Sequence, residues 1–418
     1  MTFLFYFCYN LILTLALPFI WIGAYLNDKL GASLSGQKKI WAELTRFKQK
    51  VKLDPKPIVW LHAASAGEFE QIVPLLARLK DMDVYVFQTL TSATIYYKVS
   101  QSDQFDGVSF LPWDIYFRVH KFISILNPAI FINTRHDIWP NLLLALHRNN
   151  IRNVLINANL YRDSKRLFPV IKSINKIVFK NMDHMYTGSV SLRGLLKQLY
   201  SGPIDVVGDT RFDQVFERSQ VNDQELISET IVVDRRVIVY GSTITSDLEV
   251  VTGAIAKASN DDKLLHIIVP HEAHERDVIP WESEFFRAKR KSIRQSEIEH
   301  YQGENIIIWN RVGQLADLYK YADLAFIGAG FTTGVHSVTE AAIYHVPSAH
   351  GPKYDILAEA IELVESGLST VVTNSDELAA FLTLEQMTID TLSNQIDIFT
   401  KARIGATDKV IKTEFPLN

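Results

Sequence analysis

The chain of 418 residues has one cysteine, little glycine or proline, and no marked excess of charge of either sign. The single cysteine, Cys8, excludes an intrachain disulfide and a cysteine metal cluster, which is compatible with a reducing compartment. Glycine (19) and proline (14) are not enriched and 47% of the residues are hydrophobic, which excludes a disordered or fibrous protein. The net charge of -4 disfavours a nucleic-acid partner, because such binders usually carry a basic domain or face.

The longest hydrophobic run lies at the N-terminus. Residues 3–26 carry no charge, and a helix of this length measures about 36 Å, enough to cross a hydrocarbon core of roughly 30 Å. Basic residues dominate 29–56, so the positive-inside rule predicts a cytoplasmic body. We expect a membrane anchor at 1–28 and a basic juxtamembrane segment at 29–56 that is attracted to anionic lipid. A helix that lies on the membrane or packs on the body is the alternative.

The remaining chain alternates short apolar runs with helical patterns, which is typical of βαβ units with parallel sheets. Strands are expected in a first series at 58–63, 84–90, 129–133, 153–158 and 204–207, and in a second series at 236–240, 264–269, 304–309, 323–327 and 368–373. The polar interval 214–233 separates the two series. We therefore predict an α/β protein with two Rossmann-like domains, 57–215 and 216–418, that face a cleft.

Polar residues and glycines cluster directly after several of these strands. Such clusters are the segments 64–68 and 135–141 in the first series, and 241–243, 270–272, 328–337 and 350–352 in the second. In open parallel sheets, ligands bind beyond the carboxyl ends of the strands. Any one cluster alone is ordinary turn chemistry, but the set together predicts a ligand site between the two domains.

Two cofactor patterns are missing. No G-x-G-x-x-G motif follows the first predicted strand, where a dinucleotide fingerprint would place it. His271 and His274 follow a strand at a spacing of three residues, whereas the helical zinc motif needs a spacing of four. We therefore expect no metal and no cofactor.

Five segments together resemble one family. They are WLHAASAGEFEQIVPLL (60–76), DIWPNLL (137–143), GDTRFD (208–213), GST (241–243) and IGAGFTTGVHSVTEAA (327–342). They resemble the bacterial 3-deoxy-D-manno-octulosonic acid (Kdo) transferases, which are membrane-anchored inverting glycosyltransferases of the GT-B fold. The resemblance implies transfer of Kdo from CMP-Kdo to a lipid A precursor in lipopolysaccharide core biosynthesis. It also implies a body on the cytoplasmic side of the bacterial inner membrane.

Such a transfer needs a base for the acceptor hydroxyl and groups that hold the departing phosphate. The resemblance assigns the base to Glu68, whose alternative role is to complement a helix dipole. At the expected helix N-terminus, the dipole predicts a lowered pKa for Glu68. Asp137 is the second catalytic candidate, and Ser65, Gly67 and Arg135 are expected to contact the acceptor.

The donor site is expected to draw mainly on the second domain. Ser242 and Thr243 are predicted at a helix N-terminus, where backbone N–H groups and hydroxyls bind phosphate. Arg211 offers a permanent cation, and Glu340 matches the acidic residue that holds the ribose in many GT-B enzymes. The full set of donor-binding candidates is Arg211, Gly241, Ser242, Thr243, His271, Gly330, Gly334, His336 and Glu340.

Several residues depart from the family pattern. The family usually carries Glu-Thr-Glu where this chain has Arg135-His136-Asp137, and many members have Pro-Arg-His in place of Pro270-His271-Glu272. The loop Gly334–Ser337 replaces Gly-Gly-His-Asn, and Arg211 replaces a lysine. We therefore interpret the chain as a divergent member. Two alternatives remain open, another GT-B enzyme with a different nucleotide sugar and a catalytically silent, membrane-tethered binder of sugar nucleotides.

Overall fold

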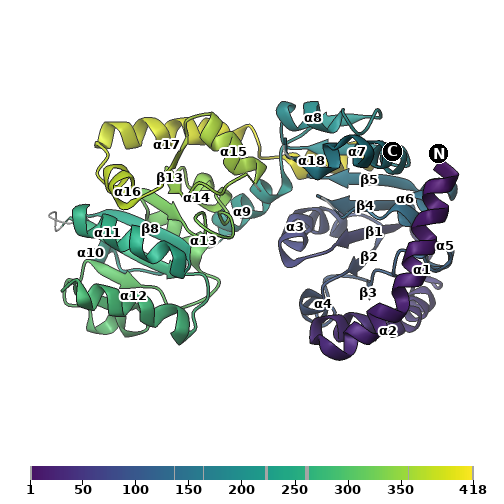
Figure 1. Cartoon of the computed structure of the whole chain (residues 1–418), viewed down its shortest axis with the longest axis horizontal. Coiled ribbons are helices and arrows are strands. Elements are labelled where there is room, and N and C mark those ends of the chain that lie inside the picture. Colours follow the sequence, from purple (N-terminus) through teal and green to yellow (C-terminus); the bar gives the residue numbers. More distant parts are fainter. Residues whose placement is uncertain are drawn as a thin grey trace. The chain divides into compact units, whose positions relative to one another are not determined.

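The computed structural model describes residues 2–135, 137–162, 164–221, 225–258, 263–355 and 357–416. His136, one of the residues of the predicted site loop, lies outside the described residues. The chain forms two compact units, Met1–Gln214 with Arg403–Asn418 and Val215–Ala402 (Figure 1). The sequence prediction assigned everything after residue 215 to the second domain, whereas in the structure the last segment groups with the first unit.

The C-terminal segment is held in the first unit by buried polar contacts. The Asp213 carboxylate accepts hydrogen bonds from the Gly405 N–H at 2.6 Å and from the Thr407 hydroxyl at 2.6 Å. The Glu414 carboxylate, which is 2% exposed, pairs with the Arg152 guanidinium at 2.8 Å. These partners are distant in sequence, so no local pattern indicates that the chain returns to its first domain.

The first unit is built on a seven-stranded parallel sheet in the order β3-β2-β1-β4-β5-β6-β7. The strands are β1 (Ile58–Ala63), β2 (Tyr85–Leu90), β3 (Gly107–Phe110), β4 (Ile130–Thr134), β5 (Arg152–Ile156), β6 (His184–Thr187) and β7 (Ile204–Val206). Both faces of the sheet are covered, so the central strands are near-continuous apolar runs. Trp60, Phe87 and Phe131 fill the core between the sheet and its helices.

Helices of the first unit surround this sheet. They are α1 (Thr2–Leu26), α2 (Asp28–Val51), α3 (Ala66–Lys80), α4 (Ala93–Val99), α5 (Tyr116–Leu126), α6 (Pro140–Arg148), α7 (Pro169–Phe179), α8 (Val190–Leu196) and α18 (Ala406–Glu414). The helix α9 (Thr210–Val221) begins in this unit and crosses into the second.

The second unit repeats the plan, with a parallel sheet in the order β10-β11-β9-β8-β12-β13-β14. Its strands are β8 (Arg236–Thr243), β9 (Leu264–Pro270), β10 (Ser292–Arg294), β11 (Ile306–Ile308), β12 (Leu324–Ile327), β13 (Ser348–His350) and β14 (Ser369–Val371). Its helices are α10 (Glu229–Val232), α11 (Leu248–Ala258), α12 (Glu275–Arg287), α13 (Leu315–Leu318), α14 (Thr339–Ile343), α15 (Ala358–Glu365), α16 (Ser375–Leu382) and α17 (Gln386–Lys401). The sequence analysis missed β3, β6, β10 and β13, which are short and carry polar or small residues instead of an apolar run.

The N-terminal helix packs on the first unit over its first turns (Figure 1). Among the described residues, the stretch Thr2–Ile20 is long and apolar enough to cross a membrane, with a mean hydropathy of 2.0. Yet Tyr6 is buried, and its hydroxyl accepts a hydrogen bond from Asn181 at 2.9 Å. The Asn10 amide exchanges hydrogen bonds of 3.0 Å with the Asn141 amide of α6. The N-terminal half of α1 therefore packs on the body, which was part of the alternative considered for this helix, and the membrane anchor stays a prediction.

Candidate functional site

The site of the first unit lies where the strand order reverses. β1 lies between β2 and β4. The next strands along the chain, β2 and β3, lie on one side of β1, and β4 lies on its other side. The carboxyl ends of two such strands leave a crevice at the sheet edge, which is where ligands bind in open α/β sheets. The loop after β1 carries Ser65, Gly67 and Glu68, and the loop after β4 carries Arg135 and Asp137. The structure thus brings together the five catalytic and acceptor-binding residues that were predicted in this domain.

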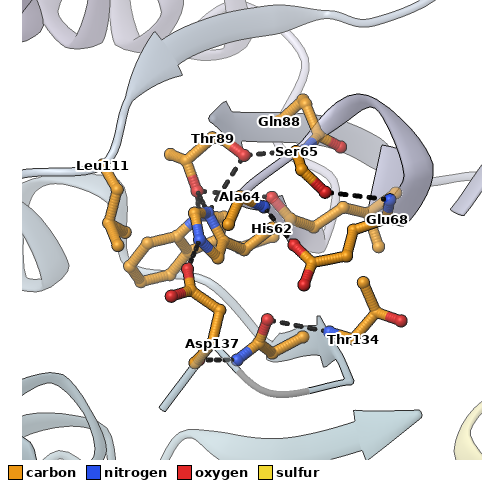
Figure 2. A network of polar contacts seen from close by, with 12 residues as sticks. His62, Ala64, Ser65, Glu68, Gln88, Thr89, Leu111, Thr134 and Asp137 are labelled. Carbon is orange, nitrogen blue, oxygen red and sulfur yellow. Dashed lines mark hydrogen bonds and ion pairs between the residues drawn. The ribbon is translucent and has the colours of Figure 1, made fainter. Parts of the chain in front are cut away.

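Glu68 is fixed at the start of α3 by a reciprocal cap (Figure 2). Ser65 is the N-cap residue, and its hydroxyl accepts a hydrogen bond from the Glu68 N–H at 3.3 Å. The Glu68 carboxylate turns back and accepts a hydrogen bond from the Ala64 N–H at 2.7 Å. The arrangement differs from a capping box in one respect, because the Glu68 carboxylate accepts from Ala64, the residue before the N-cap, and not from the N-cap N–H. A Cβ at Gly67 would meet nothing within 4 Å, so the surface at this exposed glycine is open.

Asp137 is paired with a histidine that the sequence analysis did not single out. His62 Nε2 lies 2.5 Å from Asp137 Oδ2, and its Nδ1 lies 2.9 Å from the Thr89 hydroxyl oxygen (Figure 2). The His62 side chain is fully buried, whereas that of Asp137 is 15% exposed. A polar residue inside the apolar strand 58–63 was the available signal. His62 therefore fixes the Asp137 carboxylate at the edge of the sheet.

The two carboxyl groups of the site have pKa values that move in opposite directions. Burial raises the pKa of Glu68, and the negative charge of Asp137 raises it further. Burial also acts on Asp137, but the hydrogen bond and charge of His62 outweigh it and lower the pKa of that carboxyl. The helix-dipole argument predicted a lowered pKa for Glu68. That prediction is wrong in direction, because burial of the carboxyl group outweighs the N–H groups that stabilise its charge.

Two arginines act on these carboxylates. Arg135 has a φ of 58°, in the left-handed region, and its N–H donates to the Ile156 carbonyl at 3.0 Å. Its positive charge lowers the pKa of Glu68, and the charge of Arg166 lowers the pKa of Asp137. Arg166 lies in a short 3-10 helix of one turn, Lys165–Leu167, whose sequence carries no signal for such a role. The site therefore combines two carboxylates, Glu68 and Asp137, with positive charges that stabilise them.

Arg211 is placed by a buried polar network at the start of α9. The Thr210 hydroxyl donates to the Gln71 carbonyl at 2.6 Å and accepts from the Asn157 amide at 2.8 Å. The Thr134 hydroxyl, at the end of β4, donates to the Gln71 side chain at 2.8 Å. This network ties the first turn of α9 to α3 and to the site end of the sheet. Arg211 itself is half-buried, and its N–H donates to Asp209 at 2.8 Å.

In the second unit, β8 lies between β9 and β12, so its carboxyl end is the corresponding switch point. The sequence analysis placed Ser242 and Thr243 at a helix N-terminus, but β8 continues through Thr243 with an irregularity after Tyr240. Ser242 has a φ of 52°, and the buried Thr243 hydroxyl donates to the Val269 carbonyl at 3.3 Å. α11 begins only at Leu248. Gly241 and Ser242 form a bulge within β8, and the strand continues beyond it to Thr243.

The other predicted residues of this unit follow the neighbouring strands. The His271 and His336 rings stack with centroids 4.4 Å apart at an interplanar angle of 12°. A Cβ at Gly330 would lie 2.6 Å from the Gly351 N atom, so this glycine is required by packing against another backbone segment. Gly334 has a φ of 109°, which favours glycine.

Glu340 lies in the first turn of the short helix α14. Its charge contributes to raising the pKa of Arg218, whose guanidinium pairs with Asp317 at 2.8 Å. Asp247, which the sequence analysis missed, joins the loops after β8 and β12, because its carboxylate accepts from the Ile244 N–H at 2.8 Å and the Ala329 N–H at 2.9 Å. An acid shortly after Gly-Ser-Thr was the only signal for it. The second unit thus gathers its predicted residues at one edge of its own sheet.

Comparisons with known proteins agree with this architecture. Residues 39–214 match the family model described as 3-deoxy-D-manno-octulosonic-acid transferase. The chain is 25% identical over 348 residues to the transferase of that name from Aquifex aeolicus, covering 81% of this chain and 89% of the relative. It is 24% identical to the one from Haemophilus influenzae, covering 74% of each chain.

Solved structures share the fold. UDP-GlcNAc 2-epimerase from Neisseria meningitidis superposes with a TM-score of 0.63 at 12% identity and covers 86% of this chain and 100% of its own. MurG from Acinetobacter baumannii gives a TM-score of 0.55 at 13% identity and covers 86% of this chain and 99% of its own. Together with the two parallel sheets, these matches show the GT-B fold of two Rossmann-like domains. The chain is thus similar to the Kdo transferases, through a family model over residues 39–214 and through relatives of 24–25% identity.

Proposed function

We propose that the protein transfers Kdo from CMP-Kdo to a lipid A precursor, with Glu68 as the general base. The observation that carries this proposal is the half-buried Glu68 carboxyl group beyond the carboxyl end of β1, which is held by the Ala64 N–H and whose pKa is raised by burial. A base must be deprotonated and yet basic enough to accept the proton of a hydroxyl, and a raised pKa favours the second requirement. We infer that the transferred sugar is Kdo from the names of the relatives, which are 3-deoxy-D-manno-octulosonic acid transferases.

The proposed step is an inverting displacement. The acceptor hydroxyl attacks the anomeric carbon of Kdo from the face opposite the leaving group, the bond to the CMP phosphate breaks, and Glu68 takes the hydroxyl proton. The Ala64 N–H orients the carboxyl group for this step. The Asp137 carboxylate, held by His62, keeps the pKa of Glu68 high. Ser65, Gly67 and Arg135 are assigned to the acceptor because they border Glu68 on both loops.

The donor is assigned mainly to the second unit. The loops after β8, β9 and β12 meet at this end of the second sheet, and the stacked His271 and His336 rings offer hydrogen-bond donors to a phosphate there. Thr243 supports this loop from inside, because its hydroxyl is already bonded to a strand. The residues assigned to the donor remain Arg211, Gly241, Ser242, Thr243, His271, Gly330, Gly334, His336 and Glu340.

The outward face of α1 supports a site of action at a membrane. Its exposed residues include Phe7, Leu11, Leu15 and Phe19. A helix with such a face can lie in the lipid interface while its opposite face packs on the protein. We assign the body to the cytoplasmic side of the inner membrane, because the basic segment 29–56 that follows this helix is attracted to the anionic lipids of the cytoplasmic leaflet.

The proposal is tested by a transfer assay with CMP-Kdo and a tetra-acylated lipid A precursor, read by mass spectrometry. We expect a mass gain of at least one Kdo unit. Glu68→Gln is expected to lower kcat by about 10² or more, the usual contribution of a general base, with affinity for CMP unchanged. Glu70→Gln, an exposed change on the same helix, serves as the control. CMP binding without any mass gain would indicate a silent binder, and unchanged turnover in Glu68→Gln would exclude Glu68 as the base.

A further inference from the structure

An apolar cavity of about 250 Å³ lies under the second half of α1. Its walls come from α1, from α2 and from the segment Phe110–Ile115 that follows β3. No step of the proposed reaction uses this cavity. In proteins, apolar cavities of about 150 Å³ are already large enough to bind an aromatic ring.

The inward face of α1 changes character along its length. Tyr6, Tyr9 and Asn10 form its first part, and each is hydrogen-bonded to the body. Leu13, Leu17 and Ile20 continue the same face at helical spacing, and these three line the cavity. The helix is therefore fastened by polar contacts at one end, while its apolar end covers an open space.

The cavity extends from this helix toward the catalytic loops. Trp139, which lines it, lies two residues after Asp137 on the loop that precedes α6. Thr91, another lining residue, directly follows β2, the strand that carries the His62 partner Thr89. One wall of the cavity is thus the face of α1 that turns away from lipid, and the opposite wall belongs to the loops of the acceptor site.

We propose that this cavity binds one acyl chain of the lipid acceptor. The proposal rests on the proposed function for the identity of that lipid. A nucleotide or sugar would lose its hydration here without replacement hydrogen bonds, whereas a hydrocarbon chain from the bilayer needs no hydrogen bonds and exchanges one apolar environment for another. The other face of α1 is apolar and exposed, so a chain that leaves the bilayer beside α1 remains in apolar surroundings. Seating the chain would place the sugar end of the acceptor near Glu68.

The experiment compares two paired variants of the full-length protein in lipid nanodiscs. Leu13→Phe with Leu17→Phe fills the cavity, and Leu11→Phe with Leu15→Phe makes the same change on the exposed face of the same helix. The probe is lauric acid brominated near the end of its chain, because bromine quenches tryptophans in contact with it. Trp113 and Trp139 line the cavity and report its occupation. Leu17→Ala, which enlarges the cavity, is a second test that needs no overpacking.

We expect quenching in the wild type, in the exposed-face variant and in Leu17→Ala, and its loss in the filled variant. In the transfer assay, the filled variant should raise KM for the acylated acceptor about tenfold, a factor that corresponds to roughly 1.4 kcal/mol, while kcat and the KM of a deacylated acceptor stay unchanged. Equal quenching in the filled and exposed-face variants would overturn the proposal, and so would an equal rise in KM for the deacylated acceptor. Because quenching is measured without turnover, absence of transfer would refute the proposed function and leave the cavity test valid.

Discussion

Glu68, Asp137, His62 and Arg135 form a set of charged and polar groups in which the neighbours of the two carboxyl groups shift their pKa values. Asp137 is held ionised by His62, and its charge raises the pKa of Glu68. Arg135 acts on Glu68 in the opposite sense. The family usually has an acid at the position of Arg135, so this departure changes the sign of the charge beside the proposed base.

Two substitutions are expected to move the acidic limb of the kcat–pH profile in opposite directions. Glu68 must be deprotonated to act as a base, so activity rises with pH through its pKa. Asp137→Asn removes a charge that raises this pKa and should shift the limb to lower pH. Arg135→Asn removes a charge that lowers it and should shift the limb to higher pH, and asparagine tolerates the positive φ.

The measurement is kcat as a function of pH for both variants, with the exposed Glu70→Gln as control. Glu70→Gln should retain the wild-type limb. Shifts of the same sign in both variants would contradict the assignment of the limb to Glu68.

At the scale of elements, α1 is the informative case, because its composition and its packing point to different roles. Its composition is that of a spanning helix, but its first turns carry polar residues that are paired with α6 and with the residues before α5. A polar group that loses its partner in a buried place costs about 1–3 kcal/mol. The helix therefore stabilises the domain in addition to any contact with lipid.

Asn10→Ala should lower the unfolding free energy of the first unit by about 1–3 kcal/mol, because it leaves the buried Asn141 amide without that partner. Ile12→Ala, on the exposed face of the same helix, should leave it nearly unchanged. Denaturant unfolding in a fixed detergent measures both. Equal stability of the two variants would show that α1 is not seated through Asn10.

Asp114 predicts a pH dependence of this seating. Burial raises its pKa from 3.8 to about 7, and the Tyr9 hydroxyl donates to its carboxylate. The folded state therefore binds the proton more tightly than the unfolded state, so stability is greatest below about pH 4 and falls as the pH rises to about 7. Asp114→Asn cannot ionise and should flatten this part of the curve, whereas the exposed Asp103→Asn should retain it. Denaturation midpoints between about pH 4 and about pH 8 test this, and an unchanged slope in Asp114→Asn would assign the dependence to another group.

At the scale of the whole molecule, the chain crosses from one unit to the other and returns. α9 leads out of the first unit, and Arg403–Asn418 belongs to it again. Along the sequence, the entire second unit thus lies between the C-terminal helix α18 and the sheet that this helix stabilises. Folding of the first unit is complete only when the last residues of the chain have been made.

Glu414→Ala is expected to destabilise the first unit by about 1–3 kcal/mol, because it removes the acceptor of the Arg152 guanidinium and of the Tyr186 hydroxyl. Glu377→Ala, an exposed change on α16, is the matched control in the second unit. Hydrogen exchange of the two sheets, followed by mass spectrometry, separates the effects. Faster exchange in the second sheet of Glu414→Ala, with no change in the first, would contradict the assignment of the C-terminal helix.

Much of the fold and part of the site were predictable because they depend on local order in the chain. Long apolar strands such as β1 and β9 can be recognised from the sequence alone. The residues that end neighbouring parallel strands must meet at one edge of the sheet. Short strands such as β6 and β13 were missed, because three or four residues of mixed polarity carry no period. Glu68 and Asp137 were found by their motifs, whereas His62 was passed over as a residue within a strand.

The sequence by itself determined that this is a two-domain α/β protein, with its polar loops after the strands and an apolar N-terminal helix, because each of these follows from spacing along the chain. The tertiary structure alone decided that His62 holds Asp137 across 75 residues, that burial raises the pKa of Glu68, and that Arg403–Asn418 returns to the first unit. It also decided that α1 covers an apolar cavity after its polar turns are fastened to the body. These features depend on which distant groups share a desolvated space, and that is set only when the whole domain packs.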